Sequence, residues 1–109
     1  MAEHFLYLTT IGRTTGLERQ VEIWFIERTG SFYIVAERRE ETGWVKNLTK
    51  QPNVAFSVGT RDARESVHAR TAAIARVVDD EEVKALMDAK YGWSDGLVVE
   101  LRSLRRPPA

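Results

Sequence analysis

Cysteine is absent from this sequence of 109 residues. Its absence excludes disulfide bonds, thiolate metal sites and a cysteine nucleophile. Net charge is absent as well, because 16 Lys and Arg residues balance 16 Asp and Glu residues. No overall field therefore attracts the protein to nucleic acid or to an anionic membrane, and we expect no nucleic-acid partner. Any basic site must be local.

Long apolar runs are also missing, so we expect no membrane span. The first four residues lack the basic segment of a signal peptide, which favours a cytoplasmic protein. The two histidines, His4 and His68, have no partner at ligand spacing, so we expect no metal site. The length suits a single domain over residues 1–109, with a flexible tail at 105–109. Because the core is thin, a homodimer is one expected way to supplement it.

What the sequence does contain is a series of short segments rich in β-branched and aromatic residues. They predict strands over residues 5–11, 20–26, 32–36, 54–58, 66–78 and 96–104. Thr29 and Gly30 predict the turn that makes a hairpin of the second and third strands. In the fifth, alternation places Ala73, Ala75 and Val77 on the inner face. Six strands with two helical insertions predict a mainly β protein, a β-barrel with short helices.

Two short helices are expected beside the strands. The first runs from residue 43 to about 50, with the hydroxyl of Thr42 as its cap. The second begins after Asp79, which is expected to cap it, with Glu82 three residues later in a capping-box-like arrangement. Gly92 is expected to end that helix in the left-handed conformation.

The loop after the first strand combines two glycines, two hydroxyls and nearby cations. Glycines let the backbone bend sharply and leave amides unshielded, so the loop could form a concave anion site. The same composition also suits a plain exposed hairpin loop, which is commoner. The residues concerned are Gly12, Arg13, Thr14, Thr15, Gly16 and Arg19.

The stretch from Leu8 to Gly16, followed by Arg19, resembles the opening strand and loop of the deazaflavin (F420)-dependent nitroreductase family. The resemblance continues, in the same order, to about Gly59, through Trp24-Phe25-Ile26, Tyr33-Ile34-Val35-Ala36, Gly43-Trp44-Val45-Lys46-Asn47-Leu48 and Pro52-Asn53-Val54. It implies a six-stranded, FMN-binding-like split β-barrel. Members of the family bind coenzyme F420 and relatives bind FMN, and they pass hydride to quinones, nitroaromatics and similar electrophiles. The resemblance thus implies an F420- or flavin-dependent oxidoreductase with a small, electron-poor organic substrate.

The resemblance also implies which residues hold the cofactor. They are Arg13, Thr14, Thr15, Gly16, Arg19, Ala36, Trp44, Lys46 and Asn47, with Arg38 and Arg39 in place of a lysine usual in the family. One departure is the stretch from Glu37 to Thr42, where the family has a longer serine-lysine-glycine-glycine loop. Its three carboxylates would repel an anionic cofactor tail unless they point away. FMN in place of F420, and a non-catalytic cofactor- or ligand-binding module, therefore stay open.

Catalytic residues are not identified by the sequence. Tyr7, Tyr33 and Tyr91 are the only tyrosines, and none can be assigned as a proton donor. Trp24 and Trp93 are expected to plug the barrel ends or a subunit interface. Trp44 suits a structural role on the barrel as well as a ligand contact.

Overall fold

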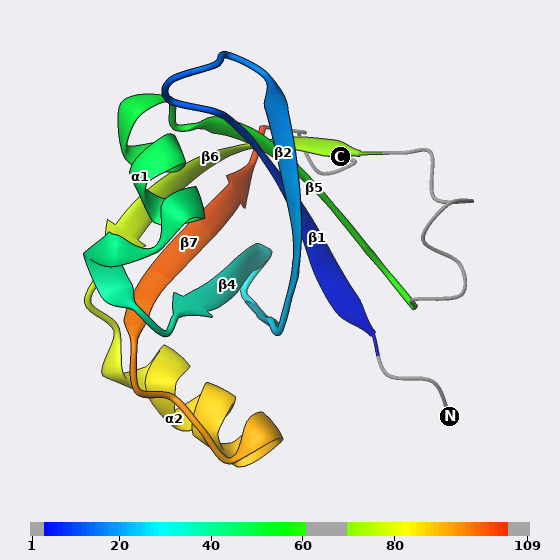
Figure 1. Ribbon diagram of the computed structural model, residues 1–109. Coiled ribbons are helices and arrows are strands. Elements are labelled where there is room, and N and C mark those ends of the chain that lie inside the picture. Colours follow the sequence, from blue (N-terminus) through cyan, green and yellow to red (C-terminus); the bar gives the residue numbers. More distant parts are fainter. Residues whose placement is uncertain (1–3, 61–69, 105–109) are drawn as a thin grey trace.

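Seven strands form one antiparallel sheet in residues 4–60 and 70–104, the part of the chain that the computed structural model describes. The sheet order is β2-β1-β5-β6-β7-β4-β3, and the strands curve around an interior (Figure 1). The strands are β1 (Phe5–Ile11), β2 (Glu18–Ile23), β3 (Ile26–Arg28), β4 (Ser31–Ala36), β5 (Asn53–Gly59), β6 (Thr71–Val78) and β7 (Leu97–Ser103). The helices are α1 (Gly43–Lys50), α2 (Glu81–Tyr91) and a short 3-10 helix, Arg39–Glu41.

The predicted mainly β split-barrel fold is confirmed, but the predicted count of six strands is wrong. The segment 20–26 is not one strand, because pairing stops after Ile23 and resumes at Ile26. Its first part pairs with β1, and β3 alone forms the hairpin with β4. The turn of that hairpin is at Thr29 and Gly30, with φ of 49° and 84°, as predicted. Residues 66–69 of the fifth predicted strand, His68 and the tail 105–109 lie outside the described residues.

Two groups of buried side chains lie on the two faces of the sheet. The larger fills the barrel interior and comprises Leu6, Leu8, Phe25, Ile34, Leu48, Val54, Phe56, Ala73, Ala75, Val99 and Leu101. The smaller lies under α2 and comprises Ile26, Tyr33, Val35, Val83, Met87 and Val98. α1 therefore closes the interior while α2 covers the outer face of β4 and β7, consistent with their places toward the top and bottom of Figure 1. In the described residues, neither helix is long and apolar enough to cross a membrane.

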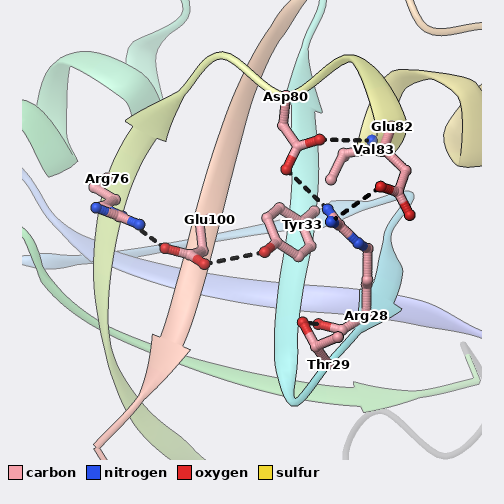
Figure 2. A network of polar contacts seen from close by, with 8 residues as sticks. All are labelled: Arg28, Thr29, Tyr33, Arg76, Asp80, Glu82, Val83 and Glu100. Atoms are coloured by element: carbon pink, nitrogen blue, oxygen red, sulfur yellow. Dashed lines mark hydrogen bonds and ion pairs between the residues drawn. The ribbon is translucent and has the colours of Figure 1, made fainter.

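Helix α2 is capped one residue later than predicted. The carboxylate of Asp80, not Asp79, accepts the backbone N–H of Val83 at 3.1 Å. The same carboxylate pairs with Arg28 at 2.8 Å, a contact that the sequence pattern could not reveal (Figure 2). The cap hydrogen bond and Arg28 together lower the pKa of Asp80. The predicted end of the helix is confirmed, since Gly92 has a φ of 73°.

The expected cap of α1 is also wrong. Thr42 stands at the position before the helix, but its hydroxyl makes no cap hydrogen bond. Instead its Oγ1 is buried with no hydrogen-bond partner.

Val77 does not lie in the interior, although Ala73 and Ala75 do. Its side chain is 48% exposed. The pairing of β5 with β6 ends at Ile74, so beyond that residue β6 has a strand on one side only, β7. The interior side chains do not reach so far along the strand.

A polar chain with a buried centre at Tyr33 and Glu100 crosses the outer face of the sheet (Figure 2). The hydroxyl of Tyr33 donates to Glu100 at 3.0 Å, and Arg76 donates to the other oxygen of that carboxylate at 2.7 Å. Burial raises the pKa of the Glu100 carboxyl, but the hydrogen bonds from Arg76 and Tyr33 outweigh burial and leave the pKa lowered. Burial, helped by the bond to Glu100, raises the pKa of Tyr33.

Candidate functional site

A cleft of about 680 Å³ opens on the surface of the described part of the chain. All three tryptophans of the chain, Trp24, Trp44 and Trp93, line it. Its other lining residues are Phe5, Glu22, Ile23, Val35, Ala36, Glu37, Arg38 and Thr42. A mostly apolar hollow with a few charged groups is typical of a site for a small organic ligand.

Different elements bring the three tryptophans together. Trp24 lies at the break between β2 and β3, Trp44 in the first turn of α1, and Trp93 just after α2. The sequence predicts Trp24 and Trp93 at the barrel ends or a subunit interface, and the structure places both on the cleft. The alternation of residues 20–26 did not reveal this, because Ile23 lines the cleft together with Glu22 and Trp24 although it belongs to the other face of the alternating pattern.

The residues expected to hold a cofactor do not form a single group. Ala36, Arg38 and Trp44 line the cleft. Lys46 borders a separate surface groove, and Arg39 pairs with Asp95 at 3.2 Å. The loop residues line a second hollow of about 420 Å³, formed by Ile11, Gly12, Arg13, Thr14, Thr15, Gly16, Lys50 and Gln51.

The glycine loop, residues 12–16, is held closed by its own backbone. The amide of Gly12 donates to Leu17 O at 2.7 Å, and that of Gly16 donates to Gly12 O at 2.8 Å. Gly16 has a φ of 73°, a backbone conformation that residues other than glycine rarely adopt. The Oγ1 of Thr15 accepts the amide of Leu17 at 3.2 Å, so this hydroxyl serves the turn itself.

Asn47 ties the glycine loop to α1. Its Oδ1 accepts both the backbone N–H of Arg13, at 3.2 Å, and the guanidinium of Arg13, at 2.9 Å. Its Nδ2 donates to the buried hydroxyl of Thr10 at 3.1 Å. With an exposed fraction of only 6%, Asn47 is a structural link between loop and helix in addition to its expected place near a cofactor.

The second hollow carries positive charge that no acidic side chain neutralises within the described residues. The guanidinium of Arg13 bonds to neutral oxygens, those of Asn47 and of Gly43 O at 3.4 Å. The ammonium of Lys50 donates to Arg13 O at 2.8 Å. By contrast, Lys46 pairs with Glu41 at 3.4 Å. An anion is therefore the ligand that this hollow favours.

The two hollows lie at the two ends of one helix. Thr42 and Trp44, at the start of α1, line the cleft, while Lys50, at its end, lines the second hollow. A helix of 8 residues is about 12 Å long. The arrangement fits a ligand whose planar ring is joined to an anionic extension, and the buried hydroxyl of Thr42 offers a polar contact on the ring side.

Comparison with known proteins gives one matching family and many solved structures with a similar fold. The family described as F420H(2)-dependent quinone reductase matches residues 1–92. Among solved structures, the heme storage protein HutZ from Vibrio cholerae superposes with a TM-score of 0.71 and 17% identity, over 94% of this chain and 82% of that one. An F420 reductase superposes with a TM-score of 0.69 and 15% sequence identity, over 93% of this chain and 86% of that one. An F420-H2 dependent reductase, FDR-A, superposes with a TM-score of 0.57 and 19% sequence identity, over 90% of this chain and 93% of that one. At these identities the structures show the fold, and no curated protein sequence matches the chain.

Proposed function

Because this chain belongs to the F420H(2)-dependent quinone reductase family, we propose that it is an oxidoreductase that transfers hydride from reduced F420 to a small electron-poor acceptor such as a quinone. The observation that carries this proposal is the pair of hollows along α1, one aromatic and one cationic. A deazaflavin cofactor joins a planar ring, which suits the aromatic hollow, to an anionic tail, which suits the cationic one.

The cleft is the expected place of the ring. When bound, the reduced deazaflavin supplies the hydride. Ala36 at the end of β4 and Trp44 on α1 would hold the ring. The ring would also give the Thr42 hydroxyl the hydrogen-bond partner that it lacks within the described part of the chain. Apolar walls fix the distance between ring and acceptor and exclude water from the reacting atoms.

The glycine loop and its neighbours are the expected place of the anionic part. Arg13 and Lys50 supply charge that has no carboxylate partner among the described residues, and Arg38 adds a cation at the cleft. The carboxylate of Glu37, which also lines the cleft, opposes an anion there. We therefore place the tail toward Arg13 and Lys50 rather than toward Glu37.

None of the three tyrosines is among the residues that line the cleft. Reduction of a quinone by hydride also consumes one proton, and we propose that solvent supplies it. Water reaches the cleft edge, where Glu37 and Arg38 are exposed.

Titration with F420 and with FMN, followed by fluorescence, tests the proposal. We expect F420 to bind at tens of micromolar or more tightly, on the order of an ordinary cofactor affinity. We then expect menadione to oxidise reduced F420 only when the protein is present. Failure of both cofactors to bind would refute the proposal, whereas binding without turnover would favour a non-catalytic binding module.

FMN is the second candidate cofactor. The carboxylates from Glu37 to Glu41 favour it, because its single phosphate needs fewer cations than a longer anionic tail. Tighter binding of FMN than of F420 in the same titration would replace the first candidate with the second.

A further inference from the structure

The break between β2 and β3 is held open by the end of α2. The hydroxyl of Tyr91 accepts the backbone N–H of Phe25 at 3.2 Å and donates to Phe25 O at 3.0 Å. The ammonium of Lys90 donates to the same carbonyl oxygen at 2.9 Å. Side chains thus satisfy both backbone groups of the residue that leaves the strand ladder. We call Trp24, Phe25, Lys90 and Tyr91 the Trp24 corner.

This clamp turns two neighbouring aromatic side chains in opposite directions. Phe25 is buried in the barrel interior, with 8% of its surface exposed. Trp24 is 39% exposed and lines the cleft. Its indole stacks on the ring of Tyr91, with centroids 4.4 Å apart and planes at 4°.

Tyr91 backs the indole without reaching the cleft. The tyrosine ring covers one face of the indole, and Trp24 lines the cleft whereas Tyr91 does not. Lys90 also lies 4.3 Å from the centroid of the Phe25 ring and 4.9 Å from that of Tyr91. A flat aromatic surface is therefore fixed in place before any ligand arrives.

We propose that Trp24 is the stacking platform for a planar, electron-poor aromatic acceptor, and that Tyr91 and Lys90 are positioning residues that hold it. The part of this inference that concerns hydride acceptance rests on the function proposed above. Trp24 and Trp93 then form the acceptor side of the cleft, opposite in role to Ala36 and Trp44 on the cofactor side.

The electrostatics of aromatic rings favour this class of ligand. The face of an indole is electron-rich, and it attracts a ring whose own face is depleted of electrons. Quinones and nitroaromatics have such rings, whereas saturated compounds of similar size do not. Because Trp24 is already fixed by Tyr91, stacking orders few additional groups, and this preorganisation increases affinity.

The test measures binding by calorimetry in the cofactor-free protein, with menadione and its saturated analogue 2-methyldecahydronaphthalene-1,4-dione as probes. We expect menadione to bind at least about tenfold more tightly than the saturated probe. The Trp24→Leu variant should bind menadione about tenfold more weakly and the saturated probe within about twofold of the parent. The Tyr91→Phe/Lys90→Met variant keeps the ring stack, loses all three bonds to Phe25 and should weaken menadione alone, by roughly threefold.

Matched controls come from the same helix. Lys84→Met removes an ammonium and Leu86→Ala an exposed apolar side chain, and both should leave the two affinities unchanged. Circular dichroism identifies any variant that fails to fold. If Trp24→Leu fails to fold, the Tyr91→Phe/Lys90→Met variant still tests the proposal. The proposal is overturned if the parent does not bind menadione, or if the variants weaken both probes equally.

The result is separable from the proposed function because no cofactor is present. If menadione selectivity depends on Trp24 but neither F420 nor FMN binds, the platform stands and the oxidoreductase proposal fails. If reduced F420 is oxidised by menadione equally well with Trp24→Leu, the oxidoreductase proposal stands and the platform fails.

Discussion

The glycine loop and the Trp24 corner are both irregular segments of backbone held by a helix, but they are held in different ways. At the loop, one buried amide of Asn47 makes three hydrogen bonds, two to Arg13 and one to Thr10. At the Trp24 corner, the hydroxyl of Tyr91, the ammonium of Lys90 and the stacking of Tyr91 on Trp24 together hold the backbone. Exposed bonds from Arg13 to Gly43 O and from Lys50 to Arg13 O add to the first attachment. Its buried and half-buried bonds are concentrated in one residue, whereas the second attachment is distributed over two.

The difference suits the ligands proposed for each region. An anion site needs amides and cations at fixed places, and a single rigid link can set them. An aromatic platform needs a flat surface at a fixed height, which stacking and backbone bonds define together. We therefore expect single substitutions to break the loop attachment and only to loosen the corner.

The largest expected effect is that of Asn47→Ala. The substitution leaves the buried hydroxyl of Thr10 and the amide of Arg13 without their partner, at a cost of about 3 kcal/mol in the free energy of unfolding. Urea denaturation measures this free energy, with the exposed Asn53→Ala as control.

At the Trp24 corner, Tyr91→Phe should lower the free energy of unfolding by only about 1 kcal/mol. Equal losses for Asn47→Ala and Tyr91→Phe would contradict the contrast between concentrated and distributed attachment.

The next effect concerns Gly96, which precedes β7 and lies against the end of β4. A Cβ at this position would be 2.5 Å from Ala36 O and 2.6 Å from the Cγ1 of Val35. Gly96→Ala should therefore cost about 2 kcal/mol and displace the cleft wall at Ala36. Gly43→Ala is the matched control, because its Cβ would meet nothing within 4 Å. If both variants unfold at the same urea concentration, the end of β4 adapts more than the close contact suggests.

The sequence could predict the region whose signals are local. The helix over residues 43–50 and the strand over 5–11 have the predicted bounds, since alternation and propensity are properties of neighbouring residues. Asn47 and the glycine loop also belong to a recognisable ordered motif. Their mutual hydrogen bonds could not be predicted, because they depend on how α1 docks.

The Trp24 corner gave no such local signal. Residues 20–26 alternate as an unbroken strand would, and the break arises from Lys90 and Tyr91, which lie 65 and 66 residues from Phe25. At the α2 cap, too, a distant residue is involved, because Asp80 pairs with Arg28, 52 residues away. At the strand break, tertiary contacts override local pattern.

A smaller effect, dependent on pH, is expected from the polar chain of Tyr33, Glu100 and Arg76 on the outer face of the sheet. The folded-state pKa of Glu100 is lowered, so its stabilisation is present above the unfolded pKa and is lost as pH falls through the folded pKa. Glu100→Gln should cost about 1–2 kcal/mol at neutral pH, and the difference from the parent should shrink below about pH 4. Urea denaturation at several pH values measures this, with exposed Glu27→Gln as control. A constant difference across the acid range would show that Glu100 acts by packing rather than by charge.

The smallest expected effect separates two adjacent arginines that the sequence could not tell apart. Arg38 lines the cleft, whereas Arg39 is turned to Asp95 in an exposed pair. If F420 occupies the cleft, Arg38→Ala should weaken its binding by about fivefold, on the order of one exposed charge contact. Arg39→Ala removes the same charge from the next residue and should leave the affinity within about twofold. Fluorescence titration at low and at moderate salt compares them, and the difference should narrow as salt rises. Equal weakening by both variants would mean that the cofactor responds to the overall charge of this stretch, and that only the glycine loop holds its anionic part specifically.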